Sequence, residues 1–425
     1  MTTQQAQSVD DIDLSDLEFW ALPWSSREAA FKTLRQKRPI AFFEEPELDE
    51  SMPFPQGPGY YAITRYHDIV EMSRHPELFC SGRSATSIFD MPVEFLEFFG
   101  SMINMDDPRH ARLRRIVSAA FNPRMVKSIE ETIQQVADSI IETVREGGEC
   151  DFVTEVASRL PLKVICDMLG IPESDYDTVF RASNVILSAG DTEYIPEGAD
   201  PVVTLLNAGA ELAGLMEGLA AFRAENPTDD LTSELLHANV DGESLTHAEL
   251  ASFFILLLVA GNETTRNAIS HGLWLLTEHP DQRATWTQDV DGVTATAVDE
   301  IVRIATPVIF MRRTVTGPTT LSDHEFTEGD KVILFYNSAN RDEEVFANPD
   351  VFDVTRAPNP HIGFGAPGPH FCLGAHLARR EMSVMFRELF RHVPDIRASA
   401  EPDRLLSNFI NGIKHLPCTF TAGGR

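Results

Sequence analysis

The feature that most constrains the fold of this chain is a long apolar stretch without proline that ends near residue 279. Thr246 and Glu249 have the spacing of a capping box, which marks the first turn of a helix. Apolar residues then recur at three- and four-residue intervals as far as Glu278, so the helix is about 50 Å long at about 1.5 Å per residue. Its apolar run from Phe253 to Ala260 is too short to span a bilayer. We therefore expect this helix to cross the core of a folded domain.

The rest of the chain indicates one mainly α domain. Hydrophobic residues make up 43% of the 425 residues and charged residues 24%, as in globular proteins. No repeat or linker divides the chain, so we expect a single domain over residues 1–425, with residues 1–20 as a poorly ordered N-terminal segment. Helical spacing predicts further helices at roughly 26–38, 108–122, 124–147, 172–188, 202–225, 293–305 and 374–392. Short strands are predicted at 60–64, 310–316 and 331–336.

The apolar and aromatic segment from Ile88 to Phe99 has no clean periodicity and lies between two helical patterns. Two interpretations fit such a segment. It is either a loop packed on the core or the wall or lid of a ligand pocket.

The net charge and the cysteine pattern indicate which binding partners and which cellular compartment to expect. A net charge of -30 repels phosphate backbones and anionic membrane surfaces, so nucleic acid is not expected as a partner. The N-terminal residues are acidic and contain no apolar run, which predicts a cytoplasmic protein without a signal peptide or an integral membrane segment. The five cysteines include no C-x-x-C pair, which favours reduced thiols over a disulfide framework.

Cys372 lies in a loop rich in glycine and proline, which runs from Phe364 to Gly374 and leads into a helical pattern. A cysteine at the N-terminus of a helix faces unpaired backbone N–H groups and the positive end of the helix dipole, and both lower the pKa of its thiol. Glycine lets the backbone approach a flat cofactor closely. The loop therefore predicts a thiolate ligand, with an inert buried cysteine as the alternative.

The middle of the long helix is interrupted by the sequence Ala260-Gly261-Asn262-Glu263-Thr264-Thr265. Small residues leave room for a ligand beside a helix, and threonine hydroxyls that bond backbone carbonyls bend it. An acid followed by a hydroxyl predicts a groove that delivers protons. In the alternative interpretation, Glu263 is solvated and Thr264 bonds only its own turn.

Two charged patterns carry little weight on their own. Glu300 and Arg303 have the E-x-x-R spacing that places both side chains on one helix face. The same spacing starts at five other glutamates, namely Glu71, Glu142, Glu263, Glu388 and Glu401. His110 and Arg114 share one face of a helix that follows Pro108, where they suit carboxylates, although an exposed basic surface is the alternative. The order of these patterns relative to the other motifs gives them their value.

In chain order, the basic helix, the groove, the E-x-x-R helix and the cysteine loop resemble the cytochrome P450 family over essentially the whole chain. The resemblance implies a triangular, mainly helical fold with small β-sheets, in which haem b lies between the long helix and the cysteine helix. It implies that Cys372 is the proximal iron ligand and that Glu263 and Thr264 relay protons. Implied haem contacts are His110, Arg114, Ala260, Gly261, Thr265, Arg313, Gly365, His370 and Gly374. Glu300, Arg303 and Arg356 are implied to form a structural ion-pair cluster.

The cysteine loop departs from the common pattern of the family. The interval from Phe364 to Cys372 is one residue longer, with the extra residue among Ala366-Pro367-Gly368. The motif therefore does not determine which residue takes the phenylalanine's usual position near the sulfur. The longer loop, together with Ser101-Met102-Ile103, Phe253-Phe254-Ile255-Leu256-Leu257 and Met311-Arg312-Arg313-Thr314, resembles a mycobacterial subgroup. Members of that subgroup hydroxylate terminal methyl groups of branched lipids and sterol side chains.

The implied reaction inserts one atom of O2 into an unactivated C–H bond of an apolar lipid. Terminal (ω) hydroxylation of methyl-branched fatty lipids is the first expectation, and hydroxylation of a sterol side chain is the alternative. A peroxide-driven enzyme and a haem protein that binds lipid without turnover are less favoured, because Glu263 and Thr264 are both present. Position relative to the matched motifs predicts a substrate pocket lined by Phe99, Ile103, Leu187, Val259, Ala260 and Phe409.

The expected partners are redox proteins. The chain shows no reductase pattern, so electrons from NAD(P)H are expected through a ferredoxin and a ferredoxin reductase. A basic patch that suits an acidic partner is predicted from residues 112–115 together with Arg379, Arg380, Arg387 and Arg391. We expect the protein to be a monomer.

Overall fold

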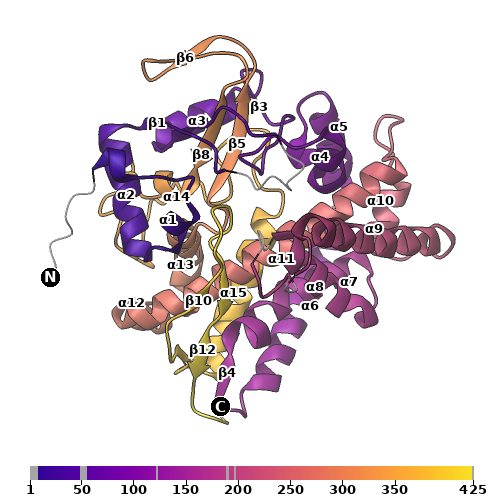
Figure 1. The fold of residues 1–425 in the computed structure, drawn as a ribbon. Helices are drawn as coiled ribbons and strands as arrows, with labels where there is room; N and C mark the ends of the chain where they lie inside the picture. The colour runs from indigo at the N-terminus through magenta and orange to yellow at the C-terminus, as the bar shows by residue number, and fades with distance from the viewer. Residues whose placement is uncertain (1–7, 48–54, 121–122, 188–190, 196–197, 424–425) are drawn as a thin grey trace.

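The computed structural model describes residues 8–47, 55–120, 123–187, 191–195 and 198–423, and their architecture is mainly helical (Figure 1). The α-helices are α1 (Leu17–Ala21), α2 (Trp24–Lys37), α3 (Tyr66–Arg74), α4 (Val93–Gly100), α5 (Arg109–Ala120), α6 (Pro123–Val144), α7 (Arg159–Leu169), α8 (Tyr176–Leu187), α9 (Pro201–Glu225), α10 (Leu231–His237), α11 (His247–Glu278), α12 (Pro280–Gln288), α13 (Val290–Ala305), α14 (Tyr336–Ala339) and α15 (Ala375–His392). Short 3-10 and π-helical turns are η1 (Val9–Asp11), η2 (Ser101–Asn104), η3 (Val153–Ala157) and η4 (Glu173–Asp175).

The strands form small sheets at the edges of the helical body. They are β1 (Ile40–Phe43), β2 (Tyr60–Ile63), β3 (Phe79–Cys80), β4 (Glu149–Asp151), β5 (Phe310–Val315), β6 (Thr319–Leu321), β7 (His324–Phe326), β8 (Lys331–Phe335), β9 (Arg397–Ala398), β10 (Asp403–Arg404), β11 (Ile413–His415) and β12 (Pro417–Thr419). The largest sheet has the order β1-β2-β8-β5-β3, in which β2 and β8 run parallel and the other pairs antiparallel. This sheet fixes the direction of β5, which carries Arg313 opposite Val332.

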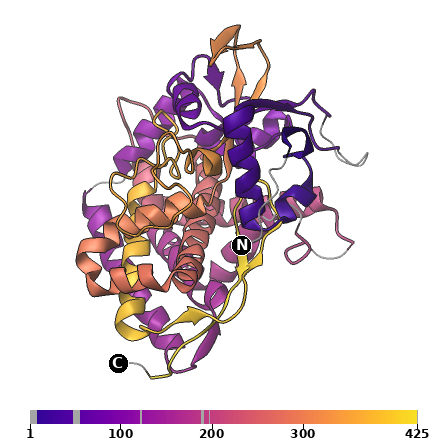
Figure 2. The same cartoon turned by 90° about the vertical axis from the view of Figure 1, so that its left-hand side faces the viewer.

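The predicted long helix is α11, and it is the centre of the fold. Thr246 and Glu249 form the expected capping box at its start. The helices α4, α7, α8, α9, α13 and α15 pack around it, and both views show it running through the middle of the molecule (Figures 1 and 2). Most side chains of α11 are buried, including Phe253, Phe254 and Ile269. The helix therefore brings groups from α4, α8 and α15 to one place.

The N-terminal segment corrects the expectation of poor order over residues 1–20. Residues 1–7 lie outside the described residues, but Leu14 is fully buried and Trp20 is 5% exposed. Trp20 packs against Phe31 and Phe335 in a second apolar cluster, and its Nε1 donates to the Leu14 carbonyl at 2.9 Å. The expectation is wrong for residues 8–20 because these apolar side chains are buried against β8 and α2.

Several helices were not predicted from the sequence. The segment from Ile88 to Phe99, interpreted as a loop or lid, contains the helix α4. Helix α7 was missed because Pro161 interrupts its pattern, but Pro161 lies in the first turn, where its missing N–H costs nothing. Helices α3, α10 and α12 were missed because they are only seven to nine residues long.

The E-x-x-R pair on α13 forms the expected ion-pair cluster. Arg303 donates from Nε and Nη2 to the two carboxylate oxygens of Glu300, both at 2.7 Å. Arg356 Nε lies 3.1 Å from the same carboxylate. Glu300 and Arg303 are fully buried, so this is an internal network that ties α13 to the segment before the cysteine loop.

Two helices, α9 and α11, are long and apolar enough to cross a membrane by length and composition. In α11, 56% of the apolar window is buried inside the fold, which identifies it as a core helix. In α9 the buried share is 28%, and Val203, Leu206 and Phe222 are exposed, but the helix packs along α8, α10 and α11. Length and composition alone are weak grounds for a membrane span, so neither helix is assigned as one.

Candidate functional site

Cys372 is presented by a tight loop at the start of α15. Its backbone N–H donates to the Phe364 carbonyl at 2.9 Å, and the N–H of Gly365 donates to Ile362 O at the same distance. Gly365 has a φ of 87°, a left-handed conformation that glycine adopts without strain. The Cys372 side chain is exposed, although α11 and α15 pack together behind it. The loop therefore places Cys372, an exposed residue, three residues before the start of α15.

The extra loop residue is accommodated at the edge of the site. A side chain at Gly368 would bring its Cβ to 2.2 Å from the Ser73 carbonyl of α3, so the loop packs directly on the end of that helix. The ring of Phe364 lies under the guanidinium of Arg379, with the charge 4.3 Å from the ring centroid. Phe364 is therefore held by Arg379 and by the backbone bond from Cys372, while Gly368 in the lengthened part lies against α3.

Opposing effects act on the Cys372 thiol. The surrounding protein desolvates it and raises its pKa. The Gly374 N–H and the guanidinium groups of Arg114 and Arg379 act in the opposite direction, because each stabilises the thiolate. Desolvation outweighs these contacts, so the pKa of the Cys372 thiol lies above its ordinary value and the expectation of a lowered pKa is wrong for the free thiol. A cation bound to the sulfur would supply the charge that holds it as a thiolate.

One face of α11 is left uncovered in its middle. Ala260 is exposed, and Gly261 and Thr264 are half-buried, while residues on either side are buried. Thr264 Oγ1 donates to the Ala260 carbonyl at 2.8 Å, the back-bond expected of a threonine inside a helix. Thr265 does not share this face, because it is buried and its hydroxyl contacts the carboxyl of Glu381 on α15. The expected haem contact at Thr265 is therefore replaced by a contact with α15.

Two arginines and two histidines converge at the other edge of the site. The rings of His110 on α5 and His370 lie 4.3 Å apart, and Arg114 Nη2 donates to the Phe371 carbonyl at 2.7 Å. Burial, with the charges of Arg313, His110 and Arg114, lowers the pKa of His370 to about 2. In the described ranges, no carboxylate pairs with Arg114 or Arg313, and Asp107 lies 3.5 Å from His110. This cluster suits anionic groups.

The residues present fit a haem. The buried Nε2 of His110 has no hydrogen-bond partner within the described part of the chain, and it lies among cations that suit two carboxylates. Cys372 offers a sulfur, and the small residues Ala260 and Gly261 leave the facing part of α11 uncovered. A flat group with an iron and two propionates therefore matches the donor set.

Glu263 is buried rather than solvated. Its Oε1 accepts from Arg266 and, at 3.1 Å, from Asn267 Nδ2. Arg266 also donates from Nη1 to Asn184 Oδ1 on α8 at 2.8 Å. This network was not predicted from the sequence. Its signal there is the E-x-x-R spacing that starts at Glu263.

The predicted pocket residues lie on elements that surround the uncovered face. Phe99 on α4 and Ile103 on η2 are half-buried, as is Leu187 at the end of α8, and these three elements pack against α11. Val259 is 8% exposed and belongs to the main core. Phe409 is half-buried in the loop between β10 and β11, with its ring 5.2 Å from that of Phe310. All except Val259 have surface left for a ligand.

Apart from Arg114, the arginines of the predicted basic patch have carboxylate partners within the described residues. On α15 the pairs are Arg379 with Asp299 at 2.7 Å, Arg380 with Glu130 at 3.9 Å, Arg387 with Asp291 at 3.4 Å and Arg391 with Glu388 at 3.1 Å. On α5, Arg112 pairs with Glu249 and Arg115 with Glu243. The patch is therefore a mixed surface in which acidic side chains offset most of the positive charge.

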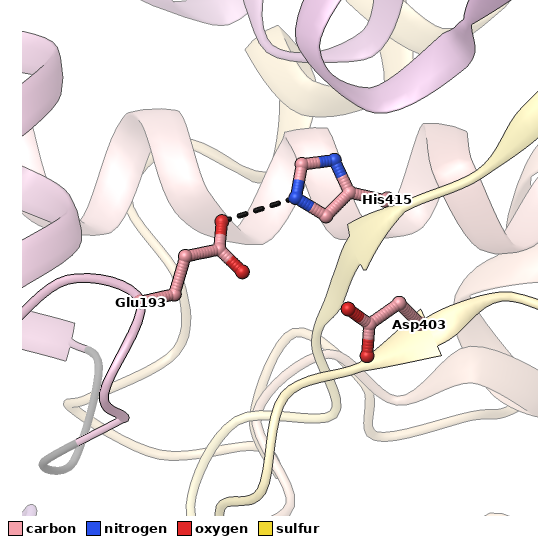
Figure 3. A group of neighbouring side chains, drawn as sticks. All are labelled: Glu193, Asp403 and His415. Atoms are coloured by element: carbon pink, nitrogen blue, oxygen red, sulfur yellow. Dashed lines mark hydrogen bonds and ion pairs between the residues drawn. The ribbon is translucent and has the colours of Figure 1, made fainter.

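A cluster of Glu193, Asp403 and His415 has three side chains of metal-ligating type close together (Figure 3). The Lys414 ammonium lies 3.3 Å from Glu193 and 3.6 Å from Asp403, where it supplies the neutralising charge. His415 bonds Glu193 through Nε2 at 3.1 Å and Asp151 through Nδ1 at 2.5 Å. We interpret the cluster as an ion-pair network that joins the segment after α8 to β11.

This network predicts a pH dependence of stability. The hydrogen bond with Asp151 raises the pKa of His415 above 6.5, so the folded state binds this proton more tightly than the unfolded state. The contribution is complete below pH 6.5 and is lost as the pH rises through the raised pKa. We expect His415→Gln to lower the free energy of unfolding by up to about 1 kcal/mol near pH 6, and by nothing measurable near pH 9. Denaturant unfolding at both values checks this, with the exposed His67→Gln as control, and equal losses at both values would contradict it.

Comparisons with known proteins agree with the site. The cytochrome P450 family model matches residues 214–393. A methyl-branched lipid omega-hydroxylase of Mycobacterium tuberculosis is 49% identical over 97% of this chain and 95% of that protein. A steroid C26-monooxygenase of the same species is 39% identical over 92% of this chain and 89% of that protein. A Mycobacterium marinum cytochrome P450 in complex with pseudoionone has a TM-score of 0.91 at 43% identity and covers 99% of this chain and 100% of that one. With a glycine-rich cysteine loop, two arginines at the opposite edge and relatives matched over nearly its whole length, the chain belongs to the cytochrome P450 family of haem monooxygenases.

Proposed function

We propose that the protein hydroxylates the terminal (ω) carbon of methyl-branched fatty lipids. The observation that carries the proposal is the 49% identity to a methyl-branched lipid omega-hydroxylase, against 39% to a steroid C26-monooxygenase. The half-buried apolar side chains of Phe99, Ile103 and Leu187 around the uncovered face of α11 support an apolar substrate. They offer no charged group to such a substrate, so they favour a hydrocarbon chain.

The proposed roles follow from the contacts of the site. Cys372 would hold the haem iron, which when bound activates O2 for insertion into a C–H bond. His110, Arg114, Arg313 and His370 would hold the propionates. Ala260, Gly261, Gly365 and Gly374 would let the backbone approach the haem plane. Glu263 and Thr264, adjacent on α11, would move protons, because Thr264 lies on the uncovered face and Glu263 is ionisable.

The relay predicts a specific defect in Thr264→Ala. We expect NADPH to be consumed while product per NADPH falls by roughly a hundredfold, the lower end of what general acid–base groups contribute. Hydrogen peroxide should account for the missing electrons. Thr285→Ala on α12 is the matched control, since its hydroxyl makes the same bond to the carbonyl four residues earlier, Asp281 O at 3.0 Å. Tight coupling in Thr264→Ala would remove this residue from the mechanism.

The proposal includes the source of the electrons. Electrons would come from NAD(P)H through a ferredoxin reductase and a ferredoxin. The ferredoxin would dock beside α5 and α15, where its carboxylates compete with the internal partners of Arg112, Arg379 and Arg387.

We further propose that residues 1–425 form one P450 domain and act as a cytoplasmic monomer. The packing of helices from both ends of the chain around α11 supports a single domain.

Sterol side-chain hydroxylation is the second candidate, because steroid C26-monooxygenases match over most of the chain. Optical titration of the purified ferric holoprotein separates the two. A methyl-branched fatty acid, its straight-chain analogue and a cholest-4-en-3-one-type sterol are added in turn, and the blue shift of the haem band is followed. A saturable shift at the lowest concentration with the branched acid supports the proposal. A tighter shift with the sterol would transfer the assignment to the second candidate, and no shift with any of them would overturn both.

A further inference from the structure

Glu263 is held on one oxygen only. Its Oε1 accepts hydrogen bonds from Arg266 and Asn267, whereas its buried Oε2 has no partner within the described part of the chain. The Glu263 side chain is 2% exposed, so solvent does not compete for either oxygen. With one oxygen fixed and the other unbonded, the orientation of the carboxylate is set by the two donors, and Oε2 is the oxygen available for proton exchange.

Arg266 joins this carboxylate to α8. Its Nη2 donates to Glu263 and its Nη1 donates to Asn184 Oδ1 at 2.8 Å, so one planar guanidinium spans two acceptors. The Asn184 side chain is 5% exposed and the Arg266 side chain 3% exposed, which keeps these bonds out of water. A lysine has the same charge but lacks the fork that reaches two acceptors at fixed spacing.

Asn267 joins the same carboxylate to β11. Its Nδ2 donates to Glu263 Oε1, and its Oδ1 accepts from the backbone N–H of Ile413 at 3.0 Å. Both donors to Glu263 are therefore fixed by a second segment of the chain. Leu187 lies three residues after Asn184 on α8, and the loop that carries Phe409 leads into β11. These two segments carry the predicted pocket residues Leu187 and Phe409, so a ligand bound to the predicted pocket would contact the segments that support both donors.

We propose that Arg266 is a positioning residue that couples pocket occupancy at α8 to the orientation of Glu263. The inference rests on the proposed proton relay through Glu263 and Thr264. A substrate chain against Leu187 fixes the last turn of α8, and Asn184 then holds Arg266 so that Glu263 presents Oε2 toward its neighbour on α11. Without substrate, Asn184 restrains Arg266 less, and Glu263 is oriented less well for proton delivery. The enzyme thus delivers protons efficiently only when the pocket is filled.

Two variants test the link without removing the acid. Asn184→Leu removes the acceptor on α8, and Arg266→Lys keeps the charge beside Glu263 but not the fork. Both are expected to lower product per NADPH by roughly tenfold with the best substrate, because a misplaced catalytic group costs rate without loss of binding. Substrate affinity in the optical titration should stay unchanged. The solvent deuterium isotope effect on product formation should rise, since proton delivery becomes slower.

Ser183→Ala is the matched control, because Ser183 is the neighbouring buried polar residue of α8 and its hydroxyl has no partner within the described part of the chain. The double variant of Asn184 and Arg266 should be no worse than either single variant, as expected of two residues that act as a unit. A change confined to the thermal midpoint, with coupling and isotope effect as in the unmodified enzyme, would overturn the proposal and leave Arg266 a structural residue.

Glu263→Gln separates this inference from the relay on which it rests. If Glu263→Gln uncouples turnover and the Asn184 and Arg266 variants do not, the relay stands and the link to α8 fails. If Glu263→Gln leaves coupling intact, the relay itself fails and the inference falls with it. Uncoupling in all three variants, with Ser183→Ala unchanged, supports both.

Discussion

Cys372→Ser is expected to abolish monooxygenation. A serine hydroxyl is not ionised at neutral pH, so the variant offers no thiolate to an iron and no electron density for cleavage of the O–O bond. The surroundings cannot restore an anion, because desolvation already opposes charge at this position. Product formation should fall below detection with every lipid tested, and the reduced carbonyl complex should lose the spectral signature of thiolate ligation.

The control for this prediction is Cys150→Ser, a half-buried cysteine on β4 whose sulfur lies 3.3 Å from that of Cys418 on β12. Cys150→Ser also replaces a sulfur by an oxygen, but on β4 rather than in the cysteine loop, so this variant should retain full activity. Far-UV circular dichroism of both variants checks that the fold is intact. A Cys372→Ser protein that still hydroxylates lipid with electrons from NADPH would show that another residue holds the iron.

The features that were predictable from the sequence are those set by neighbouring residues. The capping box at Thr246 and Glu249 and the proline-free pattern after it are local, and α11 begins and ends as expected. The loop before Cys372 is likewise encoded by its own glycines and by the helix that follows. Such elements are predictable because their backbone hydrogen bonds and dihedral preferences involve residues close in sequence.

The missed features depend on contacts between distant segments. Glu263 and Thr265 differ in role because Glu263 bonds Arg266, which is held by Asn184 on α8, while Thr265 contacts Glu381 on α15. Nothing within the groove motif distinguishes these directions. The burial of Leu14 and Trp20 depends on β8, more than 300 residues away. A pattern of hydrophobic spacing predicts which face of an element is apolar, but not which partner covers it.

The spacing of an E-x-x-R pattern does not predict how strongly its ion pair stabilises the fold. Stability measurements on two such pairs can test this. Glu300 with Arg303 and Glu142 with Arg145 share the same three-residue interval and the same helical ion pair, at 2.7 Å and 2.8 Å. Their surroundings differ. The first pair is fully buried, whereas the Arg145 and Glu142 side chains are 30% and 69% exposed. Burial therefore decides what each arginine contributes.

Arg303→Ala is expected to lower the free energy of unfolding by about 3–5 kcal/mol, a large share of the roughly 5–15 kcal/mol that stabilises a typical domain. The loss is large because the buried charge of Glu300 would keep Arg356 as its cationic partner but lose both bonds from Arg303. The carbonyls of Asn340, Pro349 and Val351 would each lose a donor as well. Arg145→Ala should cost less than about 1 kcal/mol, since water replaces the ion pair. Denaturant unfolding of both variants measures the difference. Similar losses for the two would mean that spacing, not burial, sets the strength of this pair.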